Sequence, residues 1–368
     1  MTNPLVRLGE LGQSPWYDFI TRDLVTSGEL TRLIAEDGLL GMTTNPTIFE
    51  KAIAGGDVYD ADVRSLAAAG RGPAEIVEAI AVADVRAACD LFSPVYRRTD
   101  GRDGLVSIEV SPTLAHDTDA TIREAERLWG AVGRPNAMIK IPGTRAGLPA
   151  ITHCIAAGLN VNVTLLFAVE RYEEVAAAYA EGLEARAARR QPIARVASVA
   201  SFFVSRVDTM VDPLLDRAGG EAAQLRGTTA IANAALAYAA FRRLTAEPRW
   251  AALAAAGARP QRPLWASTST KDPRYSDVHY VEPLVAADTV NTLPPETFSA
   301  YRDHGRPAIR IQEALAVAPD QLAALAEAGI DLRDVTARLE TEGVSKFAGS
   351  YHSLLRGIES KMEELAVK

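Results

Sequence analysis

The sequence lacks the features of secreted and membrane-spanning proteins. Its 368 residues include only two cysteines, Cys89 and Cys154, which are too few for a disulfide scaffold and typical of a reducing compartment. No run of about 18 uncharged apolar residues predicts a membrane span, and Met1–Gln13 has no apolar stretch of the kind found in signal peptides. These absences predict a cytoplasmic protein with no membrane partner.

Positive charge and clustered histidine are also scarce. Lys and Arg number 39 against 47 Asp and Glu, which gives a formal net charge of −8. A chain of this charge without a long basic run is not expected to bind nucleic acid or an anionic membrane. The 5 histidines are scattered singly, and none stands at metal-ligand spacing from another His or Cys. We therefore expect no metal site.

What the sequence does contain is an alternation of short strand-like segments and Ala-rich helical segments. The strand-like segments are Trp16–Ile20, Leu40–Thr44, Leu105–Val110, Ala137–Ile141, Leu159–Leu165, Arg195–Ser201, Pro263–Ser267 and Thr289–Asn291. Strands that alternate with helices indicate a parallel sheet, and about eight of them close a (β/α)8 TIM barrel. A doubly wound open sheet is the alternative, but no G-x-G-x-x-G motif follows the first strand.

The last part of the chain has a different pattern. After Pro307 it has helical character only, including a long amphipathic run over Val335–Leu365. We expect residues 1–368 to form a single barrel domain, in which 307–368 are a C-terminal helical extension packed on the barrel. Such extra helices account for the length beyond the roughly 250 residues of a typical barrel.

Several predicted strands carry polar side chains on one face. Ser107 and Glu109 alternate with Ile108 and Val110, and Asn160, Asn162 and Thr164 alternate with valines. Because side chains on a strand alternate between its two faces, the polar set shares one face. Helices cover the outside of a barrel, so the polar face is expected to point inward, as is the polar pair Thr43 and Asn45. Polar groups buried in this way are costly unless they pair or bind a ligand.

Lys140 is the most informative of these residues. It lies near the C-terminal end of a predicted strand, and its neighbours Ile139 and Ile141 take the outward face. One interpretation is a snorkelling lysine or a buried ion pair with Glu109. The other is a Schiff-base nucleophile, because an amine attacks a carbonyl only when it is neutral and burial disfavours the charged form of an amine.

The residues around Lys140 suit imine chemistry. Imine formation needs an acid/base group, and Glu109 on the preceding strand is a candidate for that role through a water that Thr164 could order. Breaking a C–C bond needs a second carboxylate, for which Asp18 on the first strand is the candidate. Asn45 and Asn162 offer uncharged donors and acceptors for the hydroxyls of a polyol. Each carboxylate alone is better explained by a structural role; together they favour a site.

Two further residues predict phosphate recognition. Arg206 follows the strand-like segment that ends at Ser201 and lies where a helix begins, a place where free N–H groups and an arginine bind anions. Lys271 follows the seventh strand, and loops after late barrel strands often bind phosphate. A surface ion pair for Arg206 and a solvated loop position for Lys271 are the alternatives.

With these residues in view, the chain resembles the transaldolase family of class I (Schiff-base) aldolases, and in particular its longer bacterial members. The resemblance extends from about Ser14 to Glu359. Its motifs occur in the family's order, and they are Gly41–Phe49, Ser107–Val110, Met138–Pro142, Asn160–Phe167 and Thr289–Thr292, followed by the tail residues Glu342, Gly343, Val344 and Phe347.

The resemblance implies a (β/α)8 barrel of the non-oxidative pentose phosphate pathway that needs no cofactor. It implies that Lys140 forms an imine with C2 of sedoheptulose 7-phosphate or fructose 6-phosphate, and that Asp18 deprotonates the C4 hydroxyl so that the C3–C4 bond breaks. An aldose phosphate, glyceraldehyde 3-phosphate or erythrose 4-phosphate, would then accept the dihydroxyacetone unit. The remaining roles follow the family's motifs: Glu109 and Thr164 for the catalytic water, Asn45, Asn162 and Ser201 for the three-carbon unit, and Arg206 for phosphate.

Two positions bear on the alternatives. Shorter family members carry a second phosphate-binding Arg where this chain has Lys271, and a lysine offers a point charge instead of a bidentate fork. The related fructose 6-phosphate aldolases, which release dihydroxyacetone, resemble this chain with Gln in place of Glu109 and Tyr in place of Phe203. We therefore place Phe203 in the substrate site.

Three more possibilities stay open at this stage. An inactive barrel that only binds sugar phosphates could lose Lys140, Asp18 or Glu109 without penalty, yet all three are present. A metal-dependent aldolase is disfavoured by the scattered histidines. Helical barrel exteriors often dimerise, so a homodimer is one expectation, for which the sequence names no face.

Overall fold

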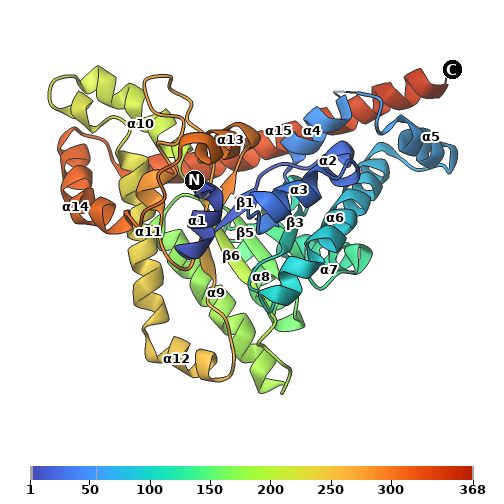
Figure 1. Cartoon of the computed structure of the whole chain (residues 1–368), viewed down its shortest axis with the longest axis horizontal. Helices are drawn as coiled ribbons and strands as arrows, with labels where there is room; N and C mark the ends of the chain where they lie inside the picture. The colour runs from blue at the N-terminus through green and yellow to red at the C-terminus, as the bar shows by residue number, and fades with distance from the viewer. Residues whose placement is uncertain (1–2, 55, 367–368) are drawn as a thin grey trace.

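The computed structural model of the chain describes residues 3–54 and 56–366 and contains a closed barrel of eight parallel strands. The strands follow one another around the ring in sequence order. Figure 1 shows the labelled strands β1, β3, β5 and β6 in the middle of the molecule with helices around them. They are β1 (Gln13–Tyr17), β2 (Gly41–Met42), β3 (Leu105–Glu109), β4 (Ala137–Pro142), β5 (Val161–Leu166), β6 (Ser198–Phe203), β7 (Arg262–Ala266) and β8 (Thr289–Leu293). The predicted (β/α)8 barrel is thus confirmed, and each predicted strand-like segment overlaps one observed strand.

Helices surround the barrel and extend beyond it. Helices α7 (Thr118–Val132), α8 (Gly147–Ala157) and α9 (Val169–Ala188) follow β3, β4 and β5, α10 (Ser205–Ala218) and α11 (Thr229–Thr245) follow β6, and α13 (Pro295–His304) follows β8. The first part of the chain supplies α1 (Pro4–Glu10), α2 (Arg22–Thr26), α3 (Glu29–Glu36), α4 (Pro46–Ala54), α5 (Asp60–Ala68) and α6 (Pro73–Arg98). The others are α12 (Pro248–Ala255), α14 (Ile311–Glu327), α15 (Leu332–Ala366) and the 3-10 turns η1 (Pro112–Leu114), η2 (Ala222–Leu225) and η3 (Glu282–Leu284).

Strand β1 begins and ends earlier than the predicted Trp16–Ile20. Gly12 has a φ of 91°, so the chain turns after α1 and pairing with β8 starts at Gln13 opposite Thr289. As a result Asp18 lies just after the strand, where its backbone N–H still donates to the carbonyl of Leu293 at 2.9 Å.

Strand β2 has only two residues, and its glycine is required by packing. A Cβ at Gly41 would lie 2.4 Å from the indole ring of Trp16. No side chain fits in that space, so β1 and β2 approach each other only because this position is glycine.

Polar side chains inside the barrel pair largely with one another. Near the N-terminal ends of the strands, Arg262 forms an ion pair with Asp103 at 2.9 Å and donates to Ser14 at 2.7 Å. One layer above, Asn162 donates to Ser107 at 3.0 Å and accepts from Ser201 at 2.7 Å. These bonds offset much of the cost of a polar lumen, and they leave only the upper layer free to meet a ligand.

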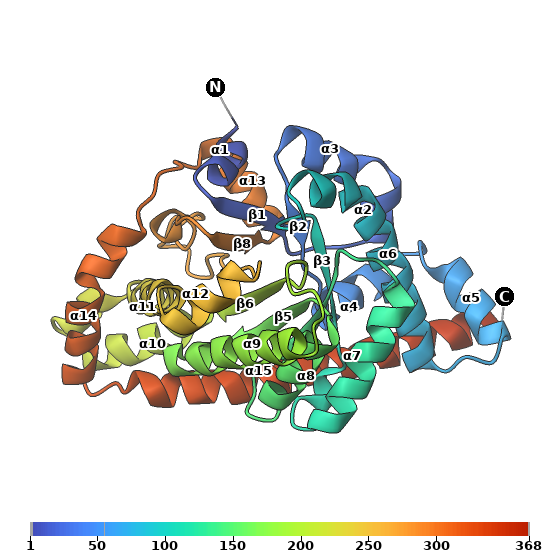
Figure 2. The ribbon, with the colours of Figure 1, turned by 90° about the horizontal axis from the view of Figure 1, so that it is seen from below.

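The last helix, α15, crosses the outside of the barrel (Figure 2). It packs against α4, α5, α6, α10 and strand β5. Thr47 donates to Ser350 at 2.9 Å, and Lys361 pairs with Asp60 at 2.7 Å. The helix therefore ties the α4–α5 region to the barrel.

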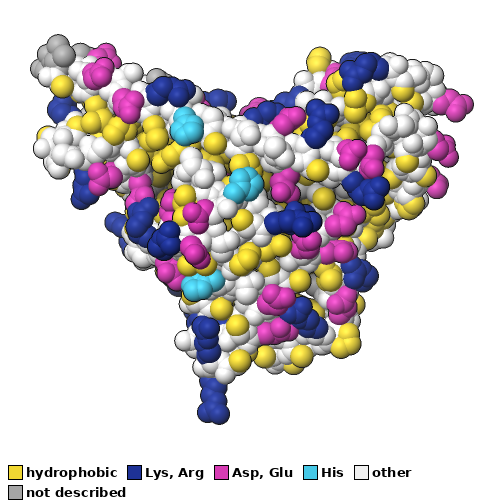
Figure 3. Space-filling model, turned by 180° about the vertical axis from the view of Figure 1, so that it is seen from behind, with side chains coloured by type: hydrophobic (Ala, Val, Ile, Leu, Met, Phe, Trp, Pro, Cys, Tyr) yellow, Lys and Arg dark blue, Asp and Glu magenta, His cyan; other side chains and the backbone are white. Residues whose placement is uncertain are grey.

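The surface carries charges of both signs. On the face shown in Figure 3 the basic and acidic side chains are interspersed, with no field of one sign. Within the described residues, no helix has the length and apolar character needed to cross a bilayer.

Candidate active site

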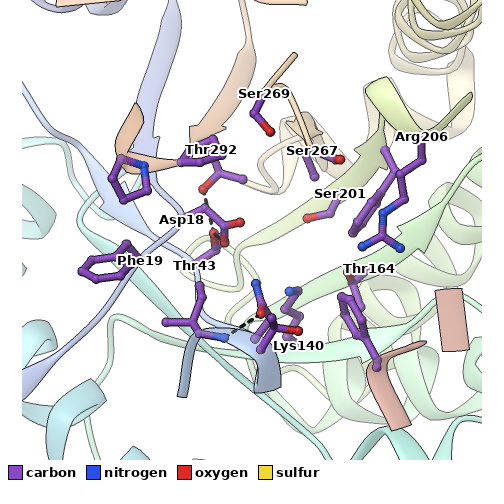
Figure 4. A pocket seen from close by; sticks show the side chains of 18 of the residues that line it. Asp18, Phe19, Thr43, Lys140, Thr164, Ser201, Arg206, Ser267, Ser269 and Thr292 are labelled. Atoms are coloured by element: carbon purple, nitrogen blue, oxygen red, sulfur yellow. Dashed lines mark hydrogen bonds between the residues drawn. The ribbon is translucent and has the colours of Figure 1, made fainter. Parts of the chain in front are cut away.

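A pocket of about 370 Å³ opens at the C-terminal ends of the strands, the face where catalytic residues of (β/α)8 barrels lie. Figure 4 shows Asp18, Thr43 and Thr292 grouped in one part of this pocket, with Ser201, Thr164 and Arg206 in another and Lys140 below. The side chains that line it come from seven strand ends, from α4, α10, α13 and α15, and from the loop after β7; those used below are Asp18, Thr43, Asn45, Lys51, Lys140, Thr164, Ser201, Phe203, Arg206, Ser267, Ser269, Lys271, Thr292 and Phe347.

Lys140 is the buried amine of this pocket. The residue is 4 % exposed, and its Nζ lies 3.2 Å from the carboxylate of Glu109 and donates to the carbonyl of Thr44 at 3.0 Å. The two interpretations of the sequence therefore coexist: Lys140 makes the buried ion pair and also faces the pocket. An ion-paired amine can pass a proton directly to its partner, which is the first requirement of a nucleophilic lysine.

Glu109 stands beside Lys140 because β3 and β4 pair in register at these two residues. Its side chain is only 3 % exposed. Burial raises the pKa of Glu109 above its ordinary value, while the charge of Lys140 acts in the opposite direction. A carboxyl with a raised pKa accepts a proton more readily than a free one, so Glu109 is suited to exchange protons with its partner.

Asp18 is the second carboxylate. Thr43 donates its hydroxyl to Asp18 at 2.6 Å and lies 2.6 Å from the hydroxyl of Thr292. Burial raises the pKa of Asp18, while Lys140 and the hydrogen bond from Thr43 lower it. Two carboxylates in different surroundings thus lie near the Lys140 amine: Glu109, which pairs with it, and Asp18, which lines the pocket and is held by a hydroxyl.

Backbone strain directs two of the pocket residues. Leu165 has a φ of 61°, and the pairing of β5 with β6 shifts between Val163 and Leu166. Ser267, which lines the pocket, has a φ of 55°. A non-glycine residue with a positive φ of this size costs about 1–3 kcal/mol, and such residues are found most often at functional sites. The bulge at Leu165 leaves the Thr164 hydroxyl in the pocket, with no hydrogen-bond partner among the described residues.

Basic side chains occupy another part of the pocket. Arg206 lies over the ring of Phe203 at 5.0 Å and over that of Phe347 at 5.7 Å, and it has no carboxylate partner in the part of the chain that the structure describes. The predicted alternative of a surface ion pair is therefore wrong. Lys271 donates to Ser269 at 2.7 Å and also lines the pocket. A stacked, unpaired guanidinium is well placed to bind a dianion.

The predicted polyol-binding residues lie at two depths. Asn45 lines the pocket but also accepts the N–H of Ile48 at 3.1 Å, at the start of α4. Ser201 lines the pocket and donates to Asn162, which lies in the layer below. Asn162 therefore supports Ser201 from beneath rather than forming part of the pocket wall, and Asn160 lies further down, bound to the carbonyls of Pro135 and Ala137.

Sequence reasoning missed three contributors. Thr43 was expected to point inward, but no role was assigned to it. The sequence identifies Phe347 only as one of the tail residues that resemble the family, although its ring lies 5.6 Å from the Lys140 amine. Lys51 on α4 also reaches the pocket. Only the path of α15 and α4 over the barrel brings the last two residues there, and no local pattern reveals that path.

Comparison with known proteins gives a consistent result. The family model described as Transaldolase/Fructose-6-phosphate aldolase matches residues 15–358. A transaldolase of Acidothermus cellulolyticus is 52% identical over 366 residues, which cover 99% of this chain and 98% of that protein. A transaldolase of Parafrankia sp. is 49% identical over the full length of both chains, and one of Trichodesmium erythraeum is 47% identical over 99% of each.

Proposed function

Since this chain belongs to the transaldolase family, we propose that Lys140 is the residue on which it carries the transferred group. The enzyme is a transferase. Transaldolases move a three-carbon dihydroxyacetone unit from a ketose phosphate to an aldose phosphate, and they do so through a lysine imine without a metal ion. We assign sedoheptulose 7-phosphate or fructose 6-phosphate as donor, and glyceraldehyde 3-phosphate or erythrose 4-phosphate as acceptor.

One observation supports the assignment of Lys140 above all others. It is an amine that is 4 % exposed, faces the pocket and lies 3.2 Å from a buried carboxylate. Proton transfer from the ammonium to Glu109 gives the neutral amine that attacks C2. Glu109 then returns a proton to the carbinolamine hydroxyl, which leaves as water. Thr164, whose hydroxyl is unpaired within the described residues, is placed to hold that water.

The second carboxylate supplies the cleavage step. Once the imine has formed, Asp18 takes the proton of the C4 hydroxyl, the C3–C4 bond breaks, and its electron pair moves into the protonated imine to give an enamine. Asp18 is held by Thr43 and lies within the electrostatic reach of Lys140. The aldose phosphate product leaves, and the reverse steps join the enamine to the acceptor.

The basic part of the pocket sets the position of the sugar chain. We assign the phosphate to Arg206 with help from Lys271, and the hydroxyls of the three-carbon unit to Asn45 and Ser201, with Asn162 fixing Ser201. The iminium ion is the electron sink of this reaction, and no step requires a cofactor.

The test is reduction of the intermediate. Incubation with fructose 6-phosphate and borohydride, followed by peptide mass mapping, is expected to place a dihydroxyacetone-derived adduct on the peptide that contains Lys140. Lys51 and Lys271 line the same pocket and serve as internal controls. The variant Lys140→Met, with its fold verified by circular dichroism, should show no adduct and no transfer. An adduct on either of the other two lysines would overturn the assignment.

The location and assembly of the enzyme are also part of the proposal. Cys89 and Cys154 are both free and buried, which suits a reducing compartment and supports a cytoplasmic location. The homodimer stays a prediction, and sedimentation velocity at micromolar concentration is its test.

A further inference from the structure

Glu109 faces a different space from the amine with which it pairs. Lys140 lines the substrate pocket, whereas Glu109 lines a second cavity of about 70 Å³, called here the side cavity. The side cavity lies among the ends of β2 and β3, helices α4, α6 and α7, and α15. Since the two side chains are 3.2 Å apart, the ion pair forms part of the boundary between the substrate pocket and the side cavity.

The carboxylate of Glu109 needs more partners than the protein gives it. Apart from the ion pair with Lys140, neither of its oxygens has a hydrogen-bond partner among the described residues, although the side chain is only 3 % exposed. Buried carboxylate oxygens are almost always hydrogen-bonded, to protein or to ordered water. A water needs roughly 10–15 Å³ of such space and 2–4 polar partners, and the side cavity has room for several.

The outer part of the side cavity is polar as well. Glu124 on α7 accepts the N–H of Ser111 at 2.8 Å, and Tyr351 on α15 lies beside it. Burial raises the pKa of both Glu124 and Tyr351, so both keep their protons more readily than in water. Glu78, which also lines the side cavity, is 32 % exposed and pairs with Arg127 at the protein surface. The lining of the side cavity thus combines apolar side chains with polar groups that include buried Glu109 and partly exposed Glu78.

The proposed reaction must exchange water with the Lys140 amine. Each imine that forms on Lys140 releases one water, and each imine that is hydrolysed consumes one. The sugar chain fills the substrate pocket at that moment, so exchange through its mouth is obstructed. On the proposed function, the oxygen that leaves C2 does so next to Glu109, which lines the side cavity.

We propose that the side cavity is the water route of the reaction, through which water leaves after imine formation and returns for hydrolysis. Glu109 hydrogen-bonds the water at the inner end, and Glu124 and Tyr351 are positioning residues at the outer end. The inference rests on the proposed role of Lys140, and it adds a function for residues that contact neither the substrate nor the reacting atoms.

A pair of matched cavity-filling variants tests the route. Ala81 on α6 is 7% exposed and lines the side cavity, whereas Ala180 on α9 is 6% exposed and lines an unrelated cavity of about 80 Å³. The rate of imine formation is measured by single-turnover trapping with borohydride and fructose 6-phosphate. Ala81→Leu is expected to slow it by about tenfold, which is less than a full loss of acid–base catalysis would cause, with KM unchanged. Ala180→Leu should react at the wild-type rate.

Two further variants keep the test decisive if Ala81→Leu does not fold. Glu124→Gln and Tyr351→Phe nearly preserve volume and remove one titratable group each. Both should slow imine formation about threefold and alter the solvent deuterium isotope effect, which a purely structural role would leave unchanged. Wild-type rates and isotope effects in these variants, or equal rates in folded Ala81→Leu and Ala180→Leu, would refute the water route. A wild-type enzyme that traps no adduct on Lys140 would instead refute the proposed function.

Discussion

At the scale of single residues, the site combines one amine with two carboxylates that differ in their partners. Glu109 pairs with Lys140, whereas Asp18 accepts the hydroxyl of Thr43. This difference supports the two roles proposed for them, proton exchange with the amine for Glu109 and deprotonation of the sugar hydroxyl for Asp18. The separation arises from strand order, since β3 and β4 are neighbours and β1 lies beside β2 and β8.

The first prediction concerns the protonation of Asp18. Burial raises its pKa, and Asp18 must be ionised to act as a base, so kcat should fall as the pH drops through that raised value. Thr43→Val removes a hydrogen bond that lowers the pKa. The acid limb of the pH–kcat profile should therefore move to higher pH.

The matched control for this prediction is Thr43→Ser, which retains the hydroxyl and should keep the wild-type profile. Transfer kinetics between pH 5 and 9 with fructose 6-phosphate and erythrose 4-phosphate provide the measurement. An unmoved limb in Thr43→Val, or one displaced to lower pH, would show that Asp18 is not the titrating base.

The second prediction concerns retention of the three-carbon unit. Phe203 presents an apolar ring to the pocket and stacks under Arg206. A hydroxyl at this position could help to protonate the enamine and so release it. Phe203→Tyr should raise the production of free dihydroxyacetone from fructose 6-phosphate several-fold when no acceptor is present. Unchanged partitioning between transfer and release would reject this role for the ring.

At the scale of elements, helix α15 is both part of the fold and part of the site. It brings Phe347 to within 5.6 Å of the Lys140 amine and 5.7 Å of the Arg206 guanidinium. One turn earlier, Gly343 lies against β5, where a Cβ would come within 3.1 Å of Leu165. The close approach of the helix to the strand is what lets the Phe347 ring reach the pocket.

The third prediction tests that contribution. Phe347→Ala removes a ring that covers the amine and holds the guanidinium, and cation–π contacts are worth about 0.5–2 kcal/mol. KM for the ketose phosphate should rise by up to about thirtyfold, and the melting temperature should fall because a buried ring is lost.

Val344→Ala, on the same helix but outside the pocket, is the control. It should lower stability while leaving KM near the wild-type value. Steady-state kinetics and thermal unfolding of both variants separate the two effects. A KM that responds equally in the two variants would show that α15 acts on the site only through general stability.

The sequence predicts the elements better than the relations between them. Alternating polarity correctly places Lys140 on the inner face of β4, and the strand and helix alternation gives the barrel. The depth of Asn162 could not be predicted, because it depends on hydrogen bonds to Ser107 and Ser201 from two other strands. The contribution of Phe347 depends likewise on where a distant helix packs, which no local periodicity determines.

At the scale of the whole molecule, a buried acidic network anchors the loop that carries Lys271. Arg226 pairs with Asp272, next to Lys271, at 2.8 Å, and also contacts Asp212. Tyr275 donates to Asp212 at 2.7 Å, and Asp208 accepts the N–H of Ala230 at 2.8 Å. The loop is thus bound to α10 and to the start of α11. A change of charge in this network should therefore change the free energy of unfolding of the whole protein.

The fourth prediction follows from Asp208. Burial raises its pKa from 3.8 to about 7. Below pH 3.8, Asp208 is protonated in both the folded and the unfolded chain. Between pH 3.8 and about 7 it ionises only in the unfolded chain, so the free energy of unfolding falls as the pH rises. Above about pH 7 it is ionised in both, and the free energy of unfolding falls no further on its account. Asp208→Asn does not ionise. Its melting temperature relative to wild type should therefore increase by several degrees between pH 4.5 and 7.5 and then level off.

The control for Asp208→Asn is Asp320→Asn, at an exposed position on α14. Its melting temperature relative to wild type should not vary with pH. Differential scanning calorimetry across this pH range measures both variants. A constant difference between Asp208→Asn and wild type would show that Asp208 ionises alike in the folded and unfolded chains.

The position of Phe347 has a consequence for biosynthesis. Lys140 in β4 is translated well before α15, yet the ring that covers its amine belongs to that final helix. A nascent chain therefore contains Lys140 before the Phe347 ring that covers its amine has been synthesised. A chain that is interrupted or clipped before Phe347 lacks this ring even if its barrel has closed, and we expect its KM for the ketose phosphate to rise as in Phe347→Ala.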